Sequence, residues 1–185
     1  IAEGITMSGQ LIIRDTAKAL DKYMNKVCGT EDQVYSFYSD TDSCYVTCQK
    51  MVEEFFPDKD VDKVVGLLDQ IATDKIEPAI ATAMKKLGNY TNVFEHKIDF
   101  KREVIADKGV FVAKKRYALN VLDDEGLRLK EPKLKVMGLE IVRSSTPAPI
   151  RSSLKEAVRL VLTSDEEHLQ NYIAEAQKTF NGLSP

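Results

Sequence analysis

Residues from which compact metal clusters and disulfide frameworks are built are scarce in this sequence. Its 185 residues include only three cysteines and two histidines. An odd number of cysteines does not make a complete disulfide framework. Cys44 and Cys48 stand four residues apart on an expected strand, but neither His96 nor His168 is near them in the sequence. We therefore interpret the cysteines, Cys28 included, as buried free thiols rather than zinc ligands.

Long apolar runs, internal repeats and low-complexity tracts are missing as well. No stretch of about 18 uncharged apolar residues occurs, so no segment is expected to span a membrane. A content of 43% apolar and 30% charged residues is typical of a globular protein. The length predicts one domain, or one domain with an appendage. Because the chain begins at Ile1 within a helix-forming segment, we expect it to be a piece of a longer polypeptide.

Charge of one sign is not in large excess, but it is unevenly distributed. The net charge of −3 argues by itself against a nucleic-acid partner. Residues 1–96 hold 10 Lys and Arg against 16 Asp and Glu, and residues 160–185 hold 1 against 4. Residues 97–159 hold 15 against 9, a net charge of +6. This basic middle points to a polyanionic partner, with a solvated surface of mixed charge as the alternative.

Hydrophobic spacing and turn residues predict an α+β fold in which an antiparallel sheet packs on helices. Helices are expected first, followed by a three-stranded meander and further helices. The expected helices are 5–27, 60–87 with a kink at Pro78, and two more after residue 147; the expected strands are 34–38, 44–47, 94–106, 110–122 and 127–140, with turns at 107–109 and 123–126.

Two aspartates, Asp40 and Asp42, stand one residue apart between two runs of strand-forming residues. Aspartate is disfavoured in strands and common in turns, so a hairpin turn is expected here. Two carboxylates on a tight turn between rigid strands can hold a hard cation such as Mg²⁺. A solvated turn without a metal remains the alternative.

A row of basic residues, KKRY, occupies positions 114–117 of the expected strand 110–122. Alternation along a strand would send Lys114 and Arg116 to one face, and Lys115 and Tyr117 to the other. Lysine and the tyrosine hydroxyl suit the phosphates of a nucleic-acid backbone. A charged strand that discourages aggregation is the alternative.

Taken together, these motifs resemble the B-family DNA polymerases, in particular the lineage of the T-even-type bacteriophages. The matching segments follow one another in the order of that family and cover essentially the whole chain. They are ITMSGQ (5–10), NKVCGTE (25–31), YSDTDS (38–43), KKRYALNV (114–121) and PKLKVMGLE…RSSTP (132–147).

The resemblance implies that residues 1–147 are the C-terminal part of a polymerase palm and that residues 148–185 begin a helical thumb. It implies template-directed nucleotidyl transfer by two Mg²⁺ ions, with Asp42 as the essential ligand and Asp40 as the weaker one. One ion would activate the primer 3′-hydroxyl, and the other would neutralise charge on the triphosphate and the leaving pyrophosphate.

The resemblance also implies the partners of such a site. Primer–template DNA would contact Tyr38, Lys114, Lys115, Tyr117 and Lys135. A deoxynucleoside triphosphate would be the second substrate, and an upstream polymerase part would complete the enzyme. If the protein is viral, it would work in the cytoplasm of the infected bacterial host.

The chain departs from the family pattern in two ways. Ser39 stands where the family usually has glycine. The family's other acidic motif, D-x-x-S-L-Y-P, its fingers motif, N-S-L-Y-G, and its exonuclease domain are not found. The chain alone is thus expected to hold half of a metal site and to be inactive.

Two other functions stay open. One is a DNA-binding module without chemistry. The other is a glycosyltransferase-like D-x-D site, which would need a nucleotide-binding α/β unit within the short stretch before Asp40 and would leave KKRY unexplained.

Overall fold

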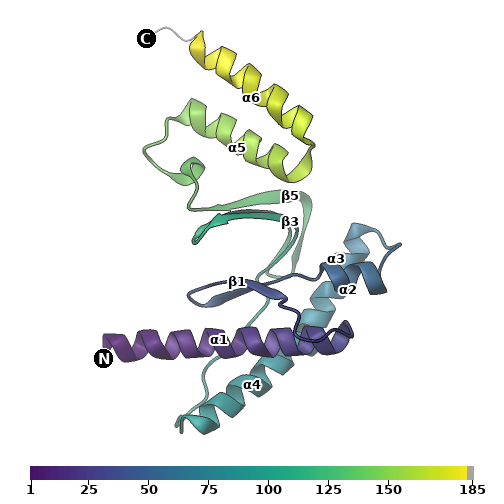
Figure 1. Ribbon diagram of the computed structural model, residues 1–185, viewed down its shortest axis with the longest axis vertical. Coiled ribbons are helices and arrows are strands. Elements are labelled where there is room, and N and C mark those ends of the chain that lie inside the picture. Colours follow the sequence, from purple (N-terminus) through teal and green to yellow (C-terminus); the bar gives the residue numbers. More distant parts are fainter. Residues whose placement is uncertain (183–185) are drawn as a thin grey trace. The chain divides into compact units, whose positions relative to one another are not determined.

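The computed structural model describes residues 1–182, so the last three residues of the expected thumb segment lie outside it. It is an α+β fold with antiparallel strands, as predicted (Figure 1). Its elements are α1 (Ala2–Val27), β1 (Ser36–Asp40), β2 (Ser43–Val46), α2 (Gln49–Phe55), α3 (Val61–Ile71), the π-helix η1 (Ala72–Ile76), α4 (Glu77–Tyr90), β3 (Val104–Ala113), β4 (Arg116–Asp124), β5 (Leu127–Met137), the 3₁₀-helix η2 (Glu140–Val142), α5 (Ala148–Thr163) and α6 (Glu166–Asn181).

The elements form two compact units, Ile1–Glu103 and Val104–Pro185, which we describe separately. The first unit holds the β1–β2 hairpin and helices α1 to α4, and the second holds the three-stranded sheet with α5 and α6. None of the helices in residues 1–182 combines the length and apolar character that crossing a bilayer would require.

Helix α1 is the support of the first unit, and its predicted extent is confirmed. Thr16, Leu20 and Met24 recur every four residues and are buried, as an amphipathic helix requires. Leu20 packs with Ile80 and Met84 of α4. The β1–β2 hairpin lies along α1, so helix and hairpin share this core (Figure 1).

The expected helix 60–87 is interrupted near Pro78, as predicted. The irregular part of the helix, however, lies before the proline and not at it. The π-helix η1 precedes α4, and Pro78 occupies the first turn of α4. Helix η1 runs into α4 without a break, and the Glu77 N–H donates to the carbonyl oxygen of Ala72. Pro78 thus follows a wide turn in which the regular hydrogen-bond pattern of the α-helix is already interrupted. Helix α2, a short helix after β2, is not predicted by the sequence patterns.

The second unit is an antiparallel meander in the order β3–β4–β5, as predicted. The central strand β4 is buried from Tyr117 to Asp123. Helix α5 packs against β3 and β4, and α6 packs against α5. Strand β5 is an edge strand, which explains why it continues through Pro132. The predicted turn at 123–126 is confirmed.

Two boundaries of the predicted meander are wrong. Residues 94–103 are not a strand, because β3 begins at Val104. The triplet Asp107–Lys108–Gly109 is not a turn but the middle of β3. The Asp107 carboxylate accepts a hydrogen bond from the buried Asn120 of β4 at 2.8 Å. Gly109 lies under Leu119, where a Cβ would come within 2.7 Å of a methyl group. Cross-strand packing therefore overrides the local turn pattern.

Candidate metal site and nucleic-acid interface

The two aspartates of the D-x-D motif lie at the tip of the β1–β2 hairpin. Asp40 pairs with Ser43, so Thr41 and Asp42 form a two-residue loop. Asp42 is exposed and Asp40 is half-buried. The predicted hairpin is confirmed.

The loop has a strained backbone at Thr41. Its φ angle is +54°, which is uncommon for a β-branched residue. The N–H group of Asp42 donates to the carbonyl oxygen of Asp40 at 2.6 Å, which makes a tight γ-turn around Thr41. The Thr41 hydroxyl also donates to the Asp40 carboxylate at 3.0 Å. Asp40 is thereby tied to the loop, while the side chain of Asp42 stays exposed at the tip.

A cross-strand aromatic pair stiffens the hairpin behind the loop. Tyr38 of β1 stands opposite Tyr45 of β2, and their ring centroids are 5.4 Å apart in an edge-to-face arrangement. Such pairs stabilise antiparallel strands beyond their buried area. Tyr38 is half-buried and lies two residues before Asp40 on β1. Its position is compatible with the predicted contact to DNA and also serves the hairpin itself.

Helix α1 holds the start of the hairpin through Asp21. The Asp21 carboxylate accepts the N–H groups of Tyr35 at 2.9 Å and of Ser36 at 2.7 Å. Tyr35 is 2% exposed and belongs to the core formed with Met24 and Met51. One side chain of α1 thus holds the backbone at the start of β1, beside the buried ring of Tyr35.

Asn25, one turn after Asp21, repeats this arrangement. Its side-chain amide donates to the carbonyl oxygen of Gln33 at 2.7 Å, and its oxygen accepts the Gln33 N–H at 3.0 Å. Sequence reasoning missed Asp21 and Asn25. Their only pattern is a polar pair spaced by four residues on a helix, which is indistinguishable from a solvated face.

As metal ligands, the two aspartates form a partial set. Carboxylate oxygens are what Mg²⁺ prefers, and a hairpin tip presents them on a rigid support. Within residues 1–182, no three His, Cys, Asp or Glu side chains are grouped closely enough to hold a metal ion. The hairpin fits the ion as one contributor to a larger ligand set.

The basic motif lies at the β3–β4 turn, not within a strand as predicted. Ala113 pairs with Arg116, so Lys114 and Lys115 are the two residues of a hairpin loop. Both lysines are exposed, and Lys115 has a φ angle of +61°. The predicted alternation of these side chains between two faces is wrong, because a tight loop does not alternate.

The other two predicted DNA contacts of this unit lie on the sheet behind the loop. Tyr117 is only 5% exposed, and its ring stacks on Phe111 with 5.2 Å between centroids. The prediction that Lys115 and Tyr117 project together is therefore wrong. Lys135 is half-buried on β5, opposite Leu119 of the central strand.

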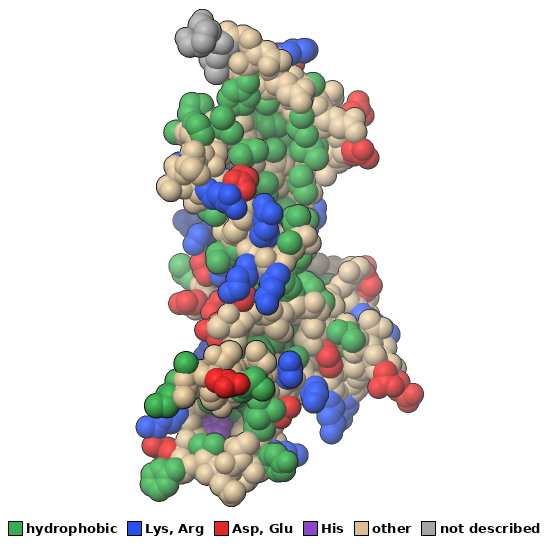
Figure 2. Space-filling model, turned by 60° about the vertical axis from the view of Figure 1, so that its left-hand side comes forward, with side chains coloured by type: hydrophobic (Ala, Val, Ile, Leu, Met, Phe, Trp, Pro, Cys, Tyr) green, Lys and Arg blue, Asp and Glu red, His purple; other side chains and the backbone are tan. Residues whose placement is uncertain are grey.

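More basic residues follow the loop and β5. A guanidinium nitrogen of Arg116 lies 3.6 Å from the Glu140 carboxylate, and one of Arg143 lies 3.3 Å from it. Figure 2 shows Lys and Arg side chains gathered near the middle of one face of the molecule. Of the 15 Lys and Arg residues in 97–159, 12 belong to the second unit.

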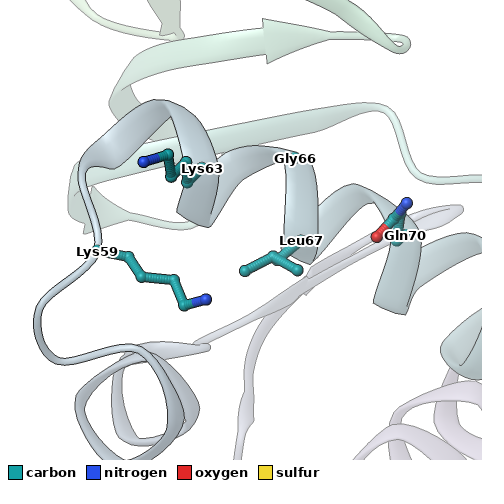
Figure 3. A pocket seen from close by; sticks show the side chains of 5 residues that line it. All are labelled: Lys59, Lys63, Gly66, Leu67 and Gln70. Carbon is teal, nitrogen blue, oxygen red and sulfur yellow. The ribbon is translucent and has the colours of Figure 1, made fainter.

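A separate shallow groove lies on α3. It has a volume of about 330 Å³ and is lined by Lys59, Lys63, Gly66, Leu67 and Gln70 (Figure 3). The Lys59 ammonium sits 5.7 Å from the ring centre of Phe56, and Lys63 lies 3.4 Å from the Asp60 carboxylate. No predicted site residue lines this groove.

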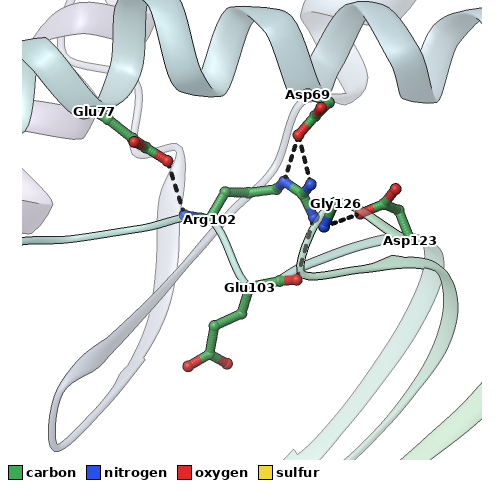
Figure 4. A network of polar contacts seen from close by, with 6 residues as sticks. All are labelled: Asp69, Glu77, Arg102, Glu103, Asp123 and Gly126. Carbon is green, nitrogen blue, oxygen red and sulfur yellow. Dashed lines mark hydrogen bonds and ion pairs between the residues drawn. The ribbon is translucent and has the colours of Figure 1, made fainter. Parts of the chain in front are cut away.

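Arg102 links the helices on both sides of η1. The Arg102 side chain is 12% exposed and donates from Nε to Asp69 at 3.0 Å (Figure 4). The Arg102 backbone N–H donates to Glu77 at 3.1 Å. A side-chain hydrogen bond to Glu77 also raises the pKa of Lys101. These contacts hold residues 101–102 to helices α3 and α4 without strand pairing.

Comparison with known proteins identifies the family to which the chain belongs. Residues 31–177 match the family model described as divergent family B DNA polymerase. The DNA-directed DNA polymerase of Enterobacteria phage T4 is 40% identical over 192 residues, covering 98% of this chain and 21% of that protein. The DNA-directed DNA polymerase of Escherichia phage RB69 is 40% identical over 175 residues, covering 89% and 19%. The chain thus spans about a fifth of these relatives, and it belongs to the divergent family B DNA polymerases.

Proposed function

We propose that the chain is the part of a DNA-directed DNA polymerase that carries its second acidic motif and contacts to primer–template DNA. The observation that carries this proposal is the β1–β2 hairpin. It presents Asp42 on a two-residue loop whose base is hydrogen-bonded to α1 through Asp21. Relatives named as phage DNA polymerases suggest that the protein works in an infected bacterial cell.

In this proposal the two aspartates have unequal roles. Asp42 is exposed and offers its carboxylate to the metal ions. Asp40 is half-buried, and one of its oxygens already accepts the Thr41 hydroxyl, so it is the weaker ligand. Bound Mg²⁺ would activate the primer 3′-hydroxyl and neutralise charge on the triphosphate. Since two cations need carboxylates from more than one strand, the remaining ligands come from the upstream polymerase part.

The proposed DNA contacts belong to different elements of the chain. Lys114 and Lys115 offer point charges from the β3–β4 loop, and Lys135 adds one from β5. Tyr117 takes part through its hydroxyl group, because its ring is buried. Tyr38 contributes from the metal-carrying hairpin. All five side chains suit backbone phosphates or sugars, so binding is independent of base sequence.

Primer extension by an assembly of this chain with the upstream polymerase part tests the proposal. The chain alone should not extend a primer, because positioning and charge neutralisation make up nearly all of phosphoryl-transfer catalysis. In the assembly, Asp42→Asn should lower extension about a thousandfold, equivalent to several kcal/mol. Asp40→Asn should lower it less.

The control is Asp58→Asn, the same change at an exposed aspartate outside the hairpin, which should leave extension unchanged. DNA binding by the Asp42→Asn assembly should also be largely retained. Full extension by that assembly would overturn the role of the hairpin. DNA binding together with an assembly that never extends a primer would favour a binding module without chemistry.

A further inference from the structure

The backbone directly after β5 closes over the β3–β4 loop. Gly138 follows the last ladder pair, Tyr117 with Met137. A Cβ at Gly138 would overlap the carbonyl oxygen of Lys115, and it would lie 3.1 Å from the carbonyl carbon and 3.2 Å from Cγ of Arg116. The obstacle is backbone, which cannot swing aside as a flexible side chain can.

Two further features show that this contact fixes the loop. Gly138 has a φ angle of +64° and Lys115 has one of +61°, so both sides of the contact have left-handed conformations. Just beyond, the Glu140 carboxylate lies 3.6 Å from a guanidinium nitrogen of Arg116, the residue after the loop. Segment 138–140 therefore contacts the loop in two ways: its backbone packs on that of Lys115 at Gly138, and Glu140 forms an ion pair with Arg116.

We propose that Gly138 is a positioning residue for DNA binding: its missing side chain lets segment 138–140 fix the backbone from which Lys114 and Lys115 project. This inference rests on the proposed function, in which these two lysines contact phosphates. A preorganised loop presents both ammonium groups at a set spacing, whereas a displaced loop does not. The chemical partner is the phosphate backbone of duplex DNA.

Salt-dependent binding separates such positioning from a loss of folded protein. Each lysine–phosphate contact contributes about one unit to the slope of log affinity against log salt concentration. A smaller folded fraction lowers the affinity by the same factor at every salt concentration and leaves this slope unchanged. The measurement is fluorescence anisotropy with a labelled primer–template duplex and the chain, between about 50 and 200 mM salt.

Gly138→Ala should lower the salt slope of the DNA affinity by about one to two units. The double variant Lys114→Ala with Lys115→Ala should lower it by the same amount. Adding Gly138→Ala to the double lysine variant should lower it no further, because both changes remove the same contacts. The matched control is Gly29→Ala. Gly29 has a similar φ angle of +58°, but a Cβ there meets nothing within 4 Å, so its slope should equal that of the wild type.

A second variant keeps the test valid if Gly138→Ala does not fold. One glycine inserted between Lys114 and Lys115 keeps both charges and avoids the clash, and three-residue hairpin loops are well tolerated. It should lower the slope as Gly138→Ala does. Wild-type slopes for both variants, while the double lysine variant loses its contacts, would overturn the positioning role alone. A wild-type slope for the double lysine variant would instead overturn the proposed DNA contact.

Discussion

Replacing Asp21 by alanine should loosen the hairpin that carries Asp42, although the two residues are not in contact. Asp21→Ala removes the acceptor of the Tyr35 and Ser36 N–H groups, at 2.9 and 2.7 Å. A buried N–H group left without a partner costs about 1–3 kcal/mol, and both groups are partly buried. We expect a loss of about 3 kcal/mol in the free energy of unfolding, because two part-buried N–H groups each lose their acceptor.

Thermal unfolding followed by circular dichroism measures this loss. An unfolding entropy of about 2.1 cal/mol/K per residue converts 3 kcal/mol in a unit of this size, residues 1–103, into a fall of about 14 °C in Tm. Amide hydrogen exchange should then place the loosening in peptides that cover residues 30–46. On the proposed function, primer extension by the assembled polymerase should fall as well, because the loop that presents Asp42 loses its support.

The control is Asp15→Ala on the same helix. The Asp15 carboxylate lies 3.9 Å from Lys18, whose side chain is exposed, and pairs of this kind contribute about 0.2–1 kcal/mol or less. The reasoning is refuted if Asp21→Ala unfolds within about 2 °C of the wild type, or if Asp15→Ala is equally damaging.

Two more predictions concern the hairpin loop and a thiol of the first unit. Thr41→Gly should leave the free energy of unfolding within about 0.5 kcal/mol of the wild type in urea titrations, because relief of the positive φ angle offsets the added freedom of the unfolded chain; a loss above about 1 kcal/mol would contradict this. Burial raises the pKa of the Cys48 thiol to about 11. Its alkylation by iodoacetamide at pH 8 should therefore be about a hundredfold slower than that of an ordinary thiol and rise tenfold per pH unit, followed by mass spectrometry; a rate that levels off near pH 9 would refute it.

The β1–β2 hairpin could be predicted from the sequence because its determinants are local. Aspartates that disfavour strands lie between residues that favour them, and the two-residue loop appears where they fall. The strain at Thr41 and the support from Asp21 could not be predicted. The support from Asp21 depends on contacts between two segments, which no pattern within one segment records, and a β-branched residue such as Thr41 gives no local signal for a positive φ angle.

The position of the loop that carries Lys114 and Lys115 could not be predicted from the sequence. Asp107–Lys108–Gly109 has the composition of a turn, and this placed the expected strand boundary too early. In the structure the Asp107 carboxylate accepts a hydrogen bond from Asn120, and the absence of a side chain at Gly109 leaves space for Leu119. The true loop is Lys114–Lys115, where Gly138 from beyond the next strand meets the backbone. Because these determinants lie on neighbouring strands, only the assembled sheet shows where the loop falls.

The packing of α1 on α4 also delays the folding of the first unit during synthesis. About 50 residues separate Val27 from Glu77, and ribosomes add about 5–20 residues per second. The apolar stripe of α1 therefore waits about 3–10 s for its partner helix. The β3–β4–β5 meander has no such delay, because each strand pairs with the next one along the chain. Newly made chains are thus most prone to associate with one another through α1, in the seconds before α4 emerges.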